Sequence, residues 1–226
     1  KLPSVIDFIE NTVDKSVYTK RERSAFHQKI YAKKPLLEIR NLKKYYRGNQ
    51  TWWFQKNTVV KAINDISFEL YQGETLGLVG ESGCGKSTLG RTLLHLEKAT
   101  SGQIFYQEKD ITQLSEREKK SLRKDIQIIF QDPFSSLNPR LMVGEAILEP
   151  MKVHQLHSSN SERKAKVLEI LEKVGLSHEH YHRYPHEFSG GQRQRIGIAR
   201  AIALQPKLIV CDESVSALDV FVQAQV

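Results

Sequence analysis

A nine-residue segment combines three glycines with a lysine and neighbouring hydroxyl side chains. Its residues are Gly80, Glu81, Ser82, Gly83, Cys84, Gly85, Lys86, Ser87 and Thr88. Glycines at this spacing let consecutive backbone N–H groups turn inward around phosphate oxygens. Lys86 can then reach the outer phosphates of a nucleotide, and the Ser87 hydroxyl can ligate Mg²⁺. An apolar run precedes the segment and a helical pattern follows it, so the sequence predicts a phosphate-binding loop.

Two carboxylates follow an apolar run near the end of the chain. Leu208–Cys211 is continuous and apolar, and Asp212 and Glu213 come directly after it. Ligands bind outside the carboxyl ends of strands in α/β sheets. We therefore expect Asp212 to hold Mg²⁺ through water, as in P-loop NTPases generally. Glu213 is predicted to face the attacking water.

A third segment, Phe188–Arg195, predicts a second anion site. Ser189 is a typical N-cap residue, and the two glycines after it leave the start of the next helix sterically bare. A bare helix N-terminus binds anions through its free N–H groups. Two phosphate sites in one chain are explained if two copies meet head to tail, each helix covering the other copy's nucleotide.

The elements that must position these segments alternate along the chain. We predict strands at 36–40, 59–70, 75–79, 104–106, 126–130 and 208–211, and helices at 87–96, 115–123, 143–150, 161–174 and 192–203. This alternation indicates an α/β fold with a mostly parallel central sheet. An antiparallel β subdomain (36–79) and a helical insert (about 131–187) are added to it. Ser159 and Glu162 predict a capping box for the helix at 161–174. Its stripe Val167–Val174 is interpreted as core of the insert.

The first 34 residues are interpreted as an extension or linker. Apolar residues recur every fourth position from Val5 to Val17, which predicts a short amphipathic helix. The stretch 19–34 is rich in lysine and arginine and is interpreted as a linker ending at Pro35. The nucleotide-binding domain is expected over 35–226.

These motifs together resemble the ATP-binding cassette (ABC) ATPases over about residues 36–226. The resemblance makes 80–88 the Walker A loop for ATP and Mg²⁺, and Tyr46 the aromatic that stacks on adenine. It makes Gln131 a Q-loop residue that senses Mg²⁺ and the membrane partner, and Asp219 part of the D-loop. Ser189, Gly190, Gly191 and Gln192 match the signature that acts in trans. Lys86 and Glu213 become the catalytic residues.

The subfamily is indicated by two further segments. Ile129–Arg140 and Tyr184–Phe188 resemble ATPase subunits of oligopeptide, dipeptide and nickel importers, most closely the second ATPase of an oligopeptide importer. The resemblance implies an ATP-hydrolysing subunit that dimerises head to tail with a second ATPase subunit. It also implies transmembrane permease partners and a peripheral position on the cytoplasmic face of the cell membrane.

The chain departs from the family pattern at several points. Phe188 stands where the signature usually has Leu, and Ser214 where Pro usually follows the catalytic Glu. The family's switch histidine lies about thirty residues beyond the D-loop, whereas Asp219 is followed by seven residues without a histidine. We therefore expect a fragment whose hydrolysis is impaired. A nucleotide-binding fragment without useful turnover stays open as an alternative.

The amino-acid composition limits the classes of protein to which the chain could belong. The chain of 226 residues is 39% hydrophobic and 27% charged, with two cysteines and a net charge of +8. These values are typical of a soluble globular protein without a disulfide framework. Basic charge alone permits nucleic-acid binding, but we expect none, because no basic stripe carries interleaved aromatics. An ABC ATPase of DNA repair or translation stays the alternative, disfavoured because the insert shows no coiled coil, zinc module or long basic arm.

Histidines at alternate positions form one further candidate site. His178, His180 and His182 are followed by His186, and such spacing could place several imidazoles around a metal. The residues between them and the family's own loop at this place favour a structural segment.

Overall fold

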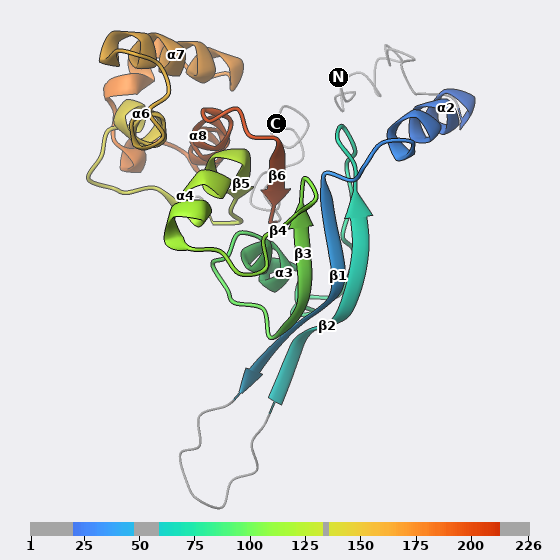
Figure 1. The fold of residues 1–226 in the computed structure, drawn as a ribbon. Helices are drawn as coiled ribbons and strands as arrows, with labels where there is room; N and C mark the ends of the chain where they lie inside the picture. Colours follow the sequence, from blue (N-terminus) through green and yellow to red (C-terminus); the bar gives the residue numbers. More distant parts are fainter. Residues whose placement is uncertain (1–19, 48–58, 133–135, 213–226) are drawn as a thin grey trace, which may run out of the picture. The chain divides into compact units, whose positions relative to one another are not determined.

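The computed structural model describes residues 20–47, 59–132 and 136–212, which divide into two compact units (Figure 1). The first unit holds the described residues up to Lys120. The second holds those from Ser121 onward.

A four-stranded antiparallel sheet organises the first unit. Its strands are β1 (Leu37–Arg47), β2 (Val59–Leu70), β3 (Ser101–Tyr106) and β4 (Lys109–Asp110), in the order β2-β1-β3-β4. Apolar side chains of three strands meet in the core beneath it, namely Leu37, Ile39, Leu42, Ile63 and Ile104. The predicted antiparallel region is confirmed. β1 runs longer than the predicted 36–40 because its polar second half still pairs with β2.

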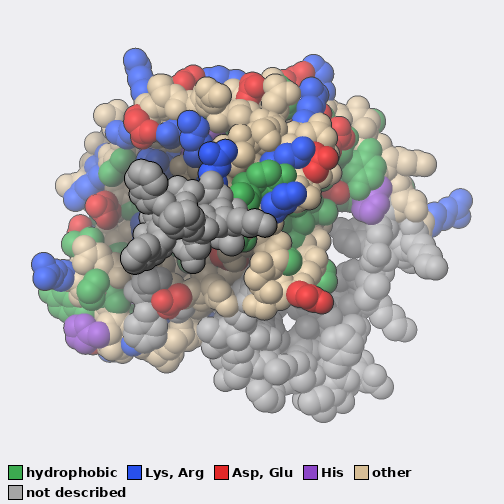
Figure 2. Space-filling view, turned by 90° about the horizontal axis from the view of Figure 1, so that it is seen from below, with side chains coloured by type: hydrophobic (Ala, Val, Ile, Leu, Met, Phe, Trp, Pro, Cys, Tyr) green, Lys and Arg blue, Asp and Glu red, His purple; other side chains and the backbone are tan. Residues whose placement is uncertain are grey.

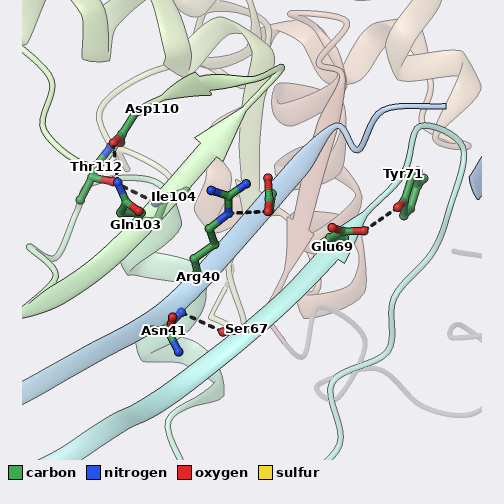
Figure 3. Close-up of polar contacts among 10 residues, drawn as sticks. Arg40, Asn41, Ser67, Glu69, Tyr71, Gln103, Ile104, Asp110 and Thr112 are labelled. Atoms are coloured by element: carbon green, nitrogen blue, oxygen red, sulfur yellow. Dashed lines mark hydrogen bonds and ion pairs between the residues drawn. The ribbon is translucent and has the colours of Figure 1, made fainter.

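Polar side chains reinforce the strand pairs (Figure 3). Ser67 Oγ accepts a hydrogen bond from the backbone N–H of Asn41 at 2.8 Å, across the β1–β2 ladder. Asp110 accepts one from the backbone N–H of Thr112 at 2.8 Å, which closes the turn after β4. This bond and a second one to the Thr112 side chain lower the pKa of the Asp110 carboxyl.

The predicted strand at 75–79 does not form. The segment has no regular secondary structure, and Leu76, Leu78 and Val79 are exposed. A buried parallel strand needs ladder partners on its flanks, and within the described ranges no residue pairs with 75–79. The apolar composition of 75–79 is typical of a buried strand, but composition does not determine whether a partner strand lies beside it.

Two helices complete the first unit. α3 (Lys86–Leu93) packs against β2, and α4 (Glu116–Asp125) leads into the second unit. The sequence predicted α3 as far as Leu96. The helix instead ends at Leu93, because His95 takes a left-handed conformation (φ 54°) that ends the helical geometry. Leu96, which lies beyond the end of the helix, is half exposed.

A parallel strand pair forms the sheet of the second unit. β5 (Ile126–Ile129) pairs with β6 (Leu208–Cys211) in register from Ile126 with Leu208 to Ile129 with Cys211. The long connection between them contains the helices, as a parallel pair requires. Both predicted strands form, β5 ending one residue before the predicted 130, and their parallel pairing agrees with the predicted parallel sheet.

The helices of the second unit build its core. They are α6 (Val143–Val153), α7 (Asn160–Lys173), η1 (His178–His182), η2 (Pro185–Glu187) and α8 (Gly190–Ile202), and Figure 1 shows α6, α7 and α8 grouped together. Val167, Ile170 and Leu171 are buried in this cluster, so the stripe is core of the insert as predicted. Ser159 caps α7 by accepting a hydrogen bond from the Glu162 amide at 3.1 Å. The predicted capping box is not closed on Ser159, because the Glu162 carboxylate accepts from the amide of Ser158, one residue earlier, at 3.0 Å.

The interpretation of residues 19–34 as a basic linker is wrong in one respect. Helix α2 (Lys20–Tyr31) forms there, ending four residues before Pro35. Frequent lysine and arginine suggested a solvated linker, but both residues have good helix propensity. The expected helix at 5–17 lies outside the described residues.

Candidate nucleotide-binding site

The predicted phosphate loop wraps onto β2 before it enters α3. Gly85 is the N-cap of α3 with φ 101°, a conformation that L side chains rarely adopt. A Cβ at Gly85 would lie 2.0 Å from the carbonyl oxygen of Ala62 on β2. Only glycine fits at this contact, so the spacing of the motif has a steric reason in this chain.

Lys86 turns back over the loop. Its ammonium Nζ donates hydrogen bonds to the carbonyl oxygens of Gly80 at 2.7 Å and Glu81 at 2.9 Å. The Cys84 Sγ lies 3.8 Å from the same nitrogen. The Lys86 ammonium thus contacts three residues of the loop, at the place where the motif predicts a bound phosphate.

The start of α3 lacks a side-chain cap. Gly85 offers no side-chain oxygen, and no side-chain hydrogen bond caps the helix. Such a helix start presents partial positive charge to an anion. Ser87 and Thr88 lie in this first turn, so the structure brings the predicted Mg²⁺ hydroxyl next to the loop that Lys86 closes.

Tyr46 is the second-last residue of β1, at the end of the strand pair where β1 ends and β2 begins. It pairs with Val60, two residues before the Ala62 that contacts Gly85. The Lys44 ammonium lies 4.6 Å from the Tyr46 ring centroid, and Glu97 fixes that ammonium at 3.1 Å. The ring stays 37% exposed, which leaves aromatic surface for a second planar group.

The second unit brings Gln131 and Asp212 to one sheet edge. Asp212 follows β6 and Gln131 lies two residues beyond β5, and these strands are parallel neighbours. The backbone N–H of Asp212 donates to the Ile129 carbonyl at 3.0 Å, so the ladder continues to this carboxylate. Asp212 is buried (9% exposed) and Gln131 is exposed. Their oxygens are of the type that Mg²⁺ prefers.

The signature segment forms the start of α8. Ser189 is the N-cap, as predicted, and its hydroxyl accepts from the Gln192 amide at 3.3 Å. The Gln192 side chain accepts in return from the Ser189 amide at 3.0 Å, which completes a capping box. Gly190 has no heavy atom within 4 Å of a built Cβ, so open space adjoins the helix start.

Arg193 has a structural role that the motif reading missed. Its guanidinium is buried and donates from Nε to the Pro185 carbonyl at 2.7 Å, and more weakly to the His186 carbonyl at 3.5 Å. These bonds hold η2 against the first turn of α8. Helical spacing could have found this role, because Arg193 lies three residues before Ile196 on the inward stripe.

Several predicted residues fall outside the described part of the chain. Glu213, Ser214 and Asp219 lie beyond Asp212 and keep their roles as predictions. Within the described ranges, no group of three histidine, cysteine or acidic side chains could hold a metal ion. His180 instead accepts a hydrogen bond at Nδ1 from the Ser177 amide at 3.0 Å and packs edge-on against Phe188.

Comparison with known proteins decides the family. Residues 63–216 match the ABC transporter family, which is more than half of the chain. The chain belongs to the ABC transporter family. The α/β class is confirmed by a solved ATP-binding cassette, MJ0796, a dimer bound to ADP and phosphate after hydrolysis. The match has a TM-score of 0.74 and 28% identity and covers 84% of this chain and 78% of the cassette.

Curated relatives narrow the resemblance within the family. The oligopeptide transport ATP-binding protein OppF of Haemophilus influenzae is 53% identical over 86% of this chain. AppF of Bacillus subtilis, an oligopeptide transport ATP-binding protein, is 55% identical over 84%. The dipeptide transport ATP-binding protein DppF of Escherichia coli is 48% identical over 88%. The chain spans 58–59% of the length of these relatives.

The helices in the described part of the chain include none that is both long and apolar enough to cross a bilayer.

Proposed function

We propose that the full-length protein is the ATP-hydrolysing subunit of an importer of oligopeptides or dipeptides. The observation that carries this is about half identity to transport ATP-binding proteins for such peptides, extending over 84–88% of the chain. The loop geometry supports it, because Gly85 and Lys86 hold the loop that the motif predicts to bind phosphate in a compact form.

ATP is proposed to bind the first unit through its phosphates and its base. When the phosphates enter, Lys86 exchanges the carbonyls of Gly80 and Glu81 for phosphate oxygens, since an anion is a stronger partner for an ammonium than a carbonyl. The exposed surface of Tyr46 stacks on adenine and reads no base edge.

Mg²⁺ is proposed to be held by Ser87, Gln131 and Asp212, by Asp212 through a water molecule. The donor set fits, because a hydroxyl, an amide oxygen and a carboxylate are hard ligands. The ion would neutralise charge on the outer phosphates. Asp212 suits this role because it directly follows β6, at the edge of the sheet where ligands bind.

Hydrolysis is assigned to Glu213, next to Asp212 in the sequence. As general base it takes the proton of the attacking water while Lys86 stabilises charge on the phosphate. The Ser189–Gln192 helix start is proposed to act across a head-to-tail dimer with a second ATPase subunit. Gln131 and the helical insert then pass the movement to permease subunits, with the protein on the cytoplasmic face of the membrane.

Gene disruption with uptake measurements tests this function. We expect the disrupted strain to lose uptake of radiolabelled dipeptide or of a longer peptide, and the full-length gene to restore it. A Glu213→Gln gene should fail to restore uptake although its product accumulates. Nickel uptake is measured in parallel. Peptide uptake that survives disruption, or loss of nickel uptake alone, would contradict a peptide importer.

A further inference from the structure

Helix α2 is attached to the first unit through its C-terminal turn. Ile30 is buried, and the Tyr31 hydroxyl donates to Glu74 at 2.9 Å. The Tyr31 ring lies 4.9 Å from the ring of Tyr71, whose hydroxyl is held by Glu69 (Figure 3). This hydrogen bond, burial and the charge of Glu69 raise the pKa of Tyr71 to about 12. The helix is therefore fixed at one end and projects beyond the sheet (Figure 1).

The outward face of α2 is basic. Arg21 lies on the side of the helix opposite the buried Ile30, and Lys29 lies between these two sides, about 100° from Ile30 around the helix axis. Lys33 continues the charge just after the helix. All three are exposed, and none makes an ion pair with another described residue. Residues 20–34 hold six lysines and arginines against one glutamate.

One large apolar side chain accompanies these cations. Phe26 is 44% exposed, three residues before Lys29 on the helix. Its ring lies 6.2 Å from that of His27, whose ring packs on Tyr31. Water solvates exposed cations well, whereas exposure of an apolar phenyl ring to water is unfavourable. Phe26 beside Lys29 therefore fits a partner that offers both negative charge and apolar depth.

Two other described helices, α4 and α7, are also rich in cations, but some of these cations pair with glutamates on the same helix. On α4, Lys119 pairs with Glu116 at 2.7 Å, and on α7, Lys166 and Lys173 both pair with Glu169. These two cations lower the pKa of Glu169 to about 2, so the charges there are mutually satisfied. Figure 2 likewise shows blue and red side chains interspersed on the face it draws.

We propose that α2 binds the anionic headgroups of a phospholipid bilayer. Arg21, Lys29 and Lys33 would contact phosphate groups, and Phe26 would enter the boundary between headgroups and acyl chains. Juxtamembrane cations are attracted to anionic leaflets, and aromatic rings favour this interface. The inference rests on the proposed function only in placing the protein beside a membrane. It gives that placement a contact with lipid, in addition to contacts with permease subunits.

Vesicle sedimentation tests the proposal without nucleotide or permease. The full-length protein is mixed with vesicles of equimolar phosphatidylglycerol and phosphatidylcholine, or of phosphatidylcholine alone. We expect binding to the first, with weakening by salt, and none to the second. The double variant R21E/K29E should bind at least about twentyfold more weakly, at roughly fivefold per cation lost. F26A should bind a few fold more weakly at unchanged charge.

A matched variant controls for net charge. K120E/R123E removes two exposed cations from α4 and changes the charge of the protein by the same amount. It should bind vesicles like the parent. Circular dichroism confirms that each variant is folded. Equal loss in both double variants, or parent protein that ignores anionic vesicles, would overturn the proposal. So would binding to double-stranded DNA that depends on Arg21 and Lys29 more strongly than vesicle binding does. ATP hydrolysis by R21E/K29E reports separately on the nucleotide site.

Discussion

Lys86 has two successive sets of partners in our interpretation. Without nucleotide its ammonium donates hydrogen bonds to the carbonyls of the consecutive residues Gly80 and Glu81. With nucleotide it contacts phosphate. The motif predicted the phosphate contacts of Lys86. Its contacts with the two carbonyls depend on the geometry of the loop, which the spacing of residues in the sequence does not determine.

Lys86→Ala should abolish ATP binding at micromolar nucleotide. The variant loses a charge-assisted phosphate contact, worth roughly 3 kcal/mol or more when one charged partner is removed. Calorimetric titration with ATP measures the affinity. Lys98→Ala, at an exposed lysine of the same unit, should bind like the parent. Equal affinity of the parent and Lys86→Ala would refute the assignment of the loop.

Gly85→Ala should destabilise the first unit and impair ATP binding. The new Cβ would meet the Ala62 carbonyl at 2.0 Å, so the loop must separate from β2 in addition to bearing the φ strain of about 1–2 kcal/mol. Gly73→Ala is the matched variant, since Gly73 also has positive φ but open space around it. Urea unfolding should show the larger loss for Gly85→Ala. Equal losses of stability in the two variants would mean that backbone strain, and not the contact with Ala62, causes the destabilisation.

At the scale of elements, η1 packs closely against α6 because Gly144 has no side chain. A Cβ there would lie 2.3–2.4 Å from three ring atoms of Tyr181. The Tyr181 hydroxyl donates to Glu145 at 3.1 Å, and the Lys164 ammonium lies 5.0 Å from the ring centroid. Burial raises the pKa of Tyr181 to about 12, with the charge of Glu145 adding to the effect.

Tyr181→Phe should therefore change how stability depends on pH. The folded pKa of about 12 exceeds the unfolded value of about 10, so the hydroxyl stabilises the fold below pH 10 and loses this effect as pH rises toward 12. At neutral pH the variant should be less stable by about 1–3 kcal/mol. Urea unfolding at increasing pH should show the two proteins converge. Tyr184→Phe, whose ring stacks on His186, serves as control. A constant gap between parent and Tyr181→Phe up to pH 12 would contradict the role of the hydroxyl.

Sequence patterns predicted most elements because hydrophobic periodicity and capping residues are local. β2 and β6 begin and end at the predicted residues, and Ser159 and Ser189 cap the helices as expected. The failures needed information from elsewhere. The strand at 75–79 depends on partners distant in sequence, and α2 depends on Tyr71 and Glu74 for its attachment.

At the scale of the whole molecule, the proposed reaction needs two copies of the cassette. The solved cassette with TM-score 0.74 is a dimer bound to ADP and phosphate. In our chain the open space at Gly190 leaves room for a phosphate at the start of α8. The Ser189–Gln192 segment predicted such a site from glycine and capping chemistry alone. The partner's identity is not encoded there.

Glu213→Gln in the full-length protein should keep ATP binding but lower turnover about 10²–10⁴-fold, the scale of a lost general base. Gln keeps the size of the side chain but cannot take a proton. Nucleotide should then hold two subunits together, as a dimer visible by size exclusion with ATP and Mg²⁺.

The added substitution Gly191→Asp should prevent this dimer by placing a carboxylate against the partner's phosphate. Circular dichroism checks that the double variant is folded. Parental hydrolysis by Glu213→Gln, or ATP binding that never produces a dimer, would show that the composite site does not operate here.

The buried Arg193 has a mechanical consequence. Its guanidinium joins the carbonyls of Pro185 and His186 to the first turn of α8, while the Ser189–Gln192 box joins that turn to the residue before it. A hinge between η2 and α8 would have to break a buried charged bond, which costs far more than thermal energy. This joint is therefore stiff. We therefore expect a displacement of η2 to carry the start of α8 along with it.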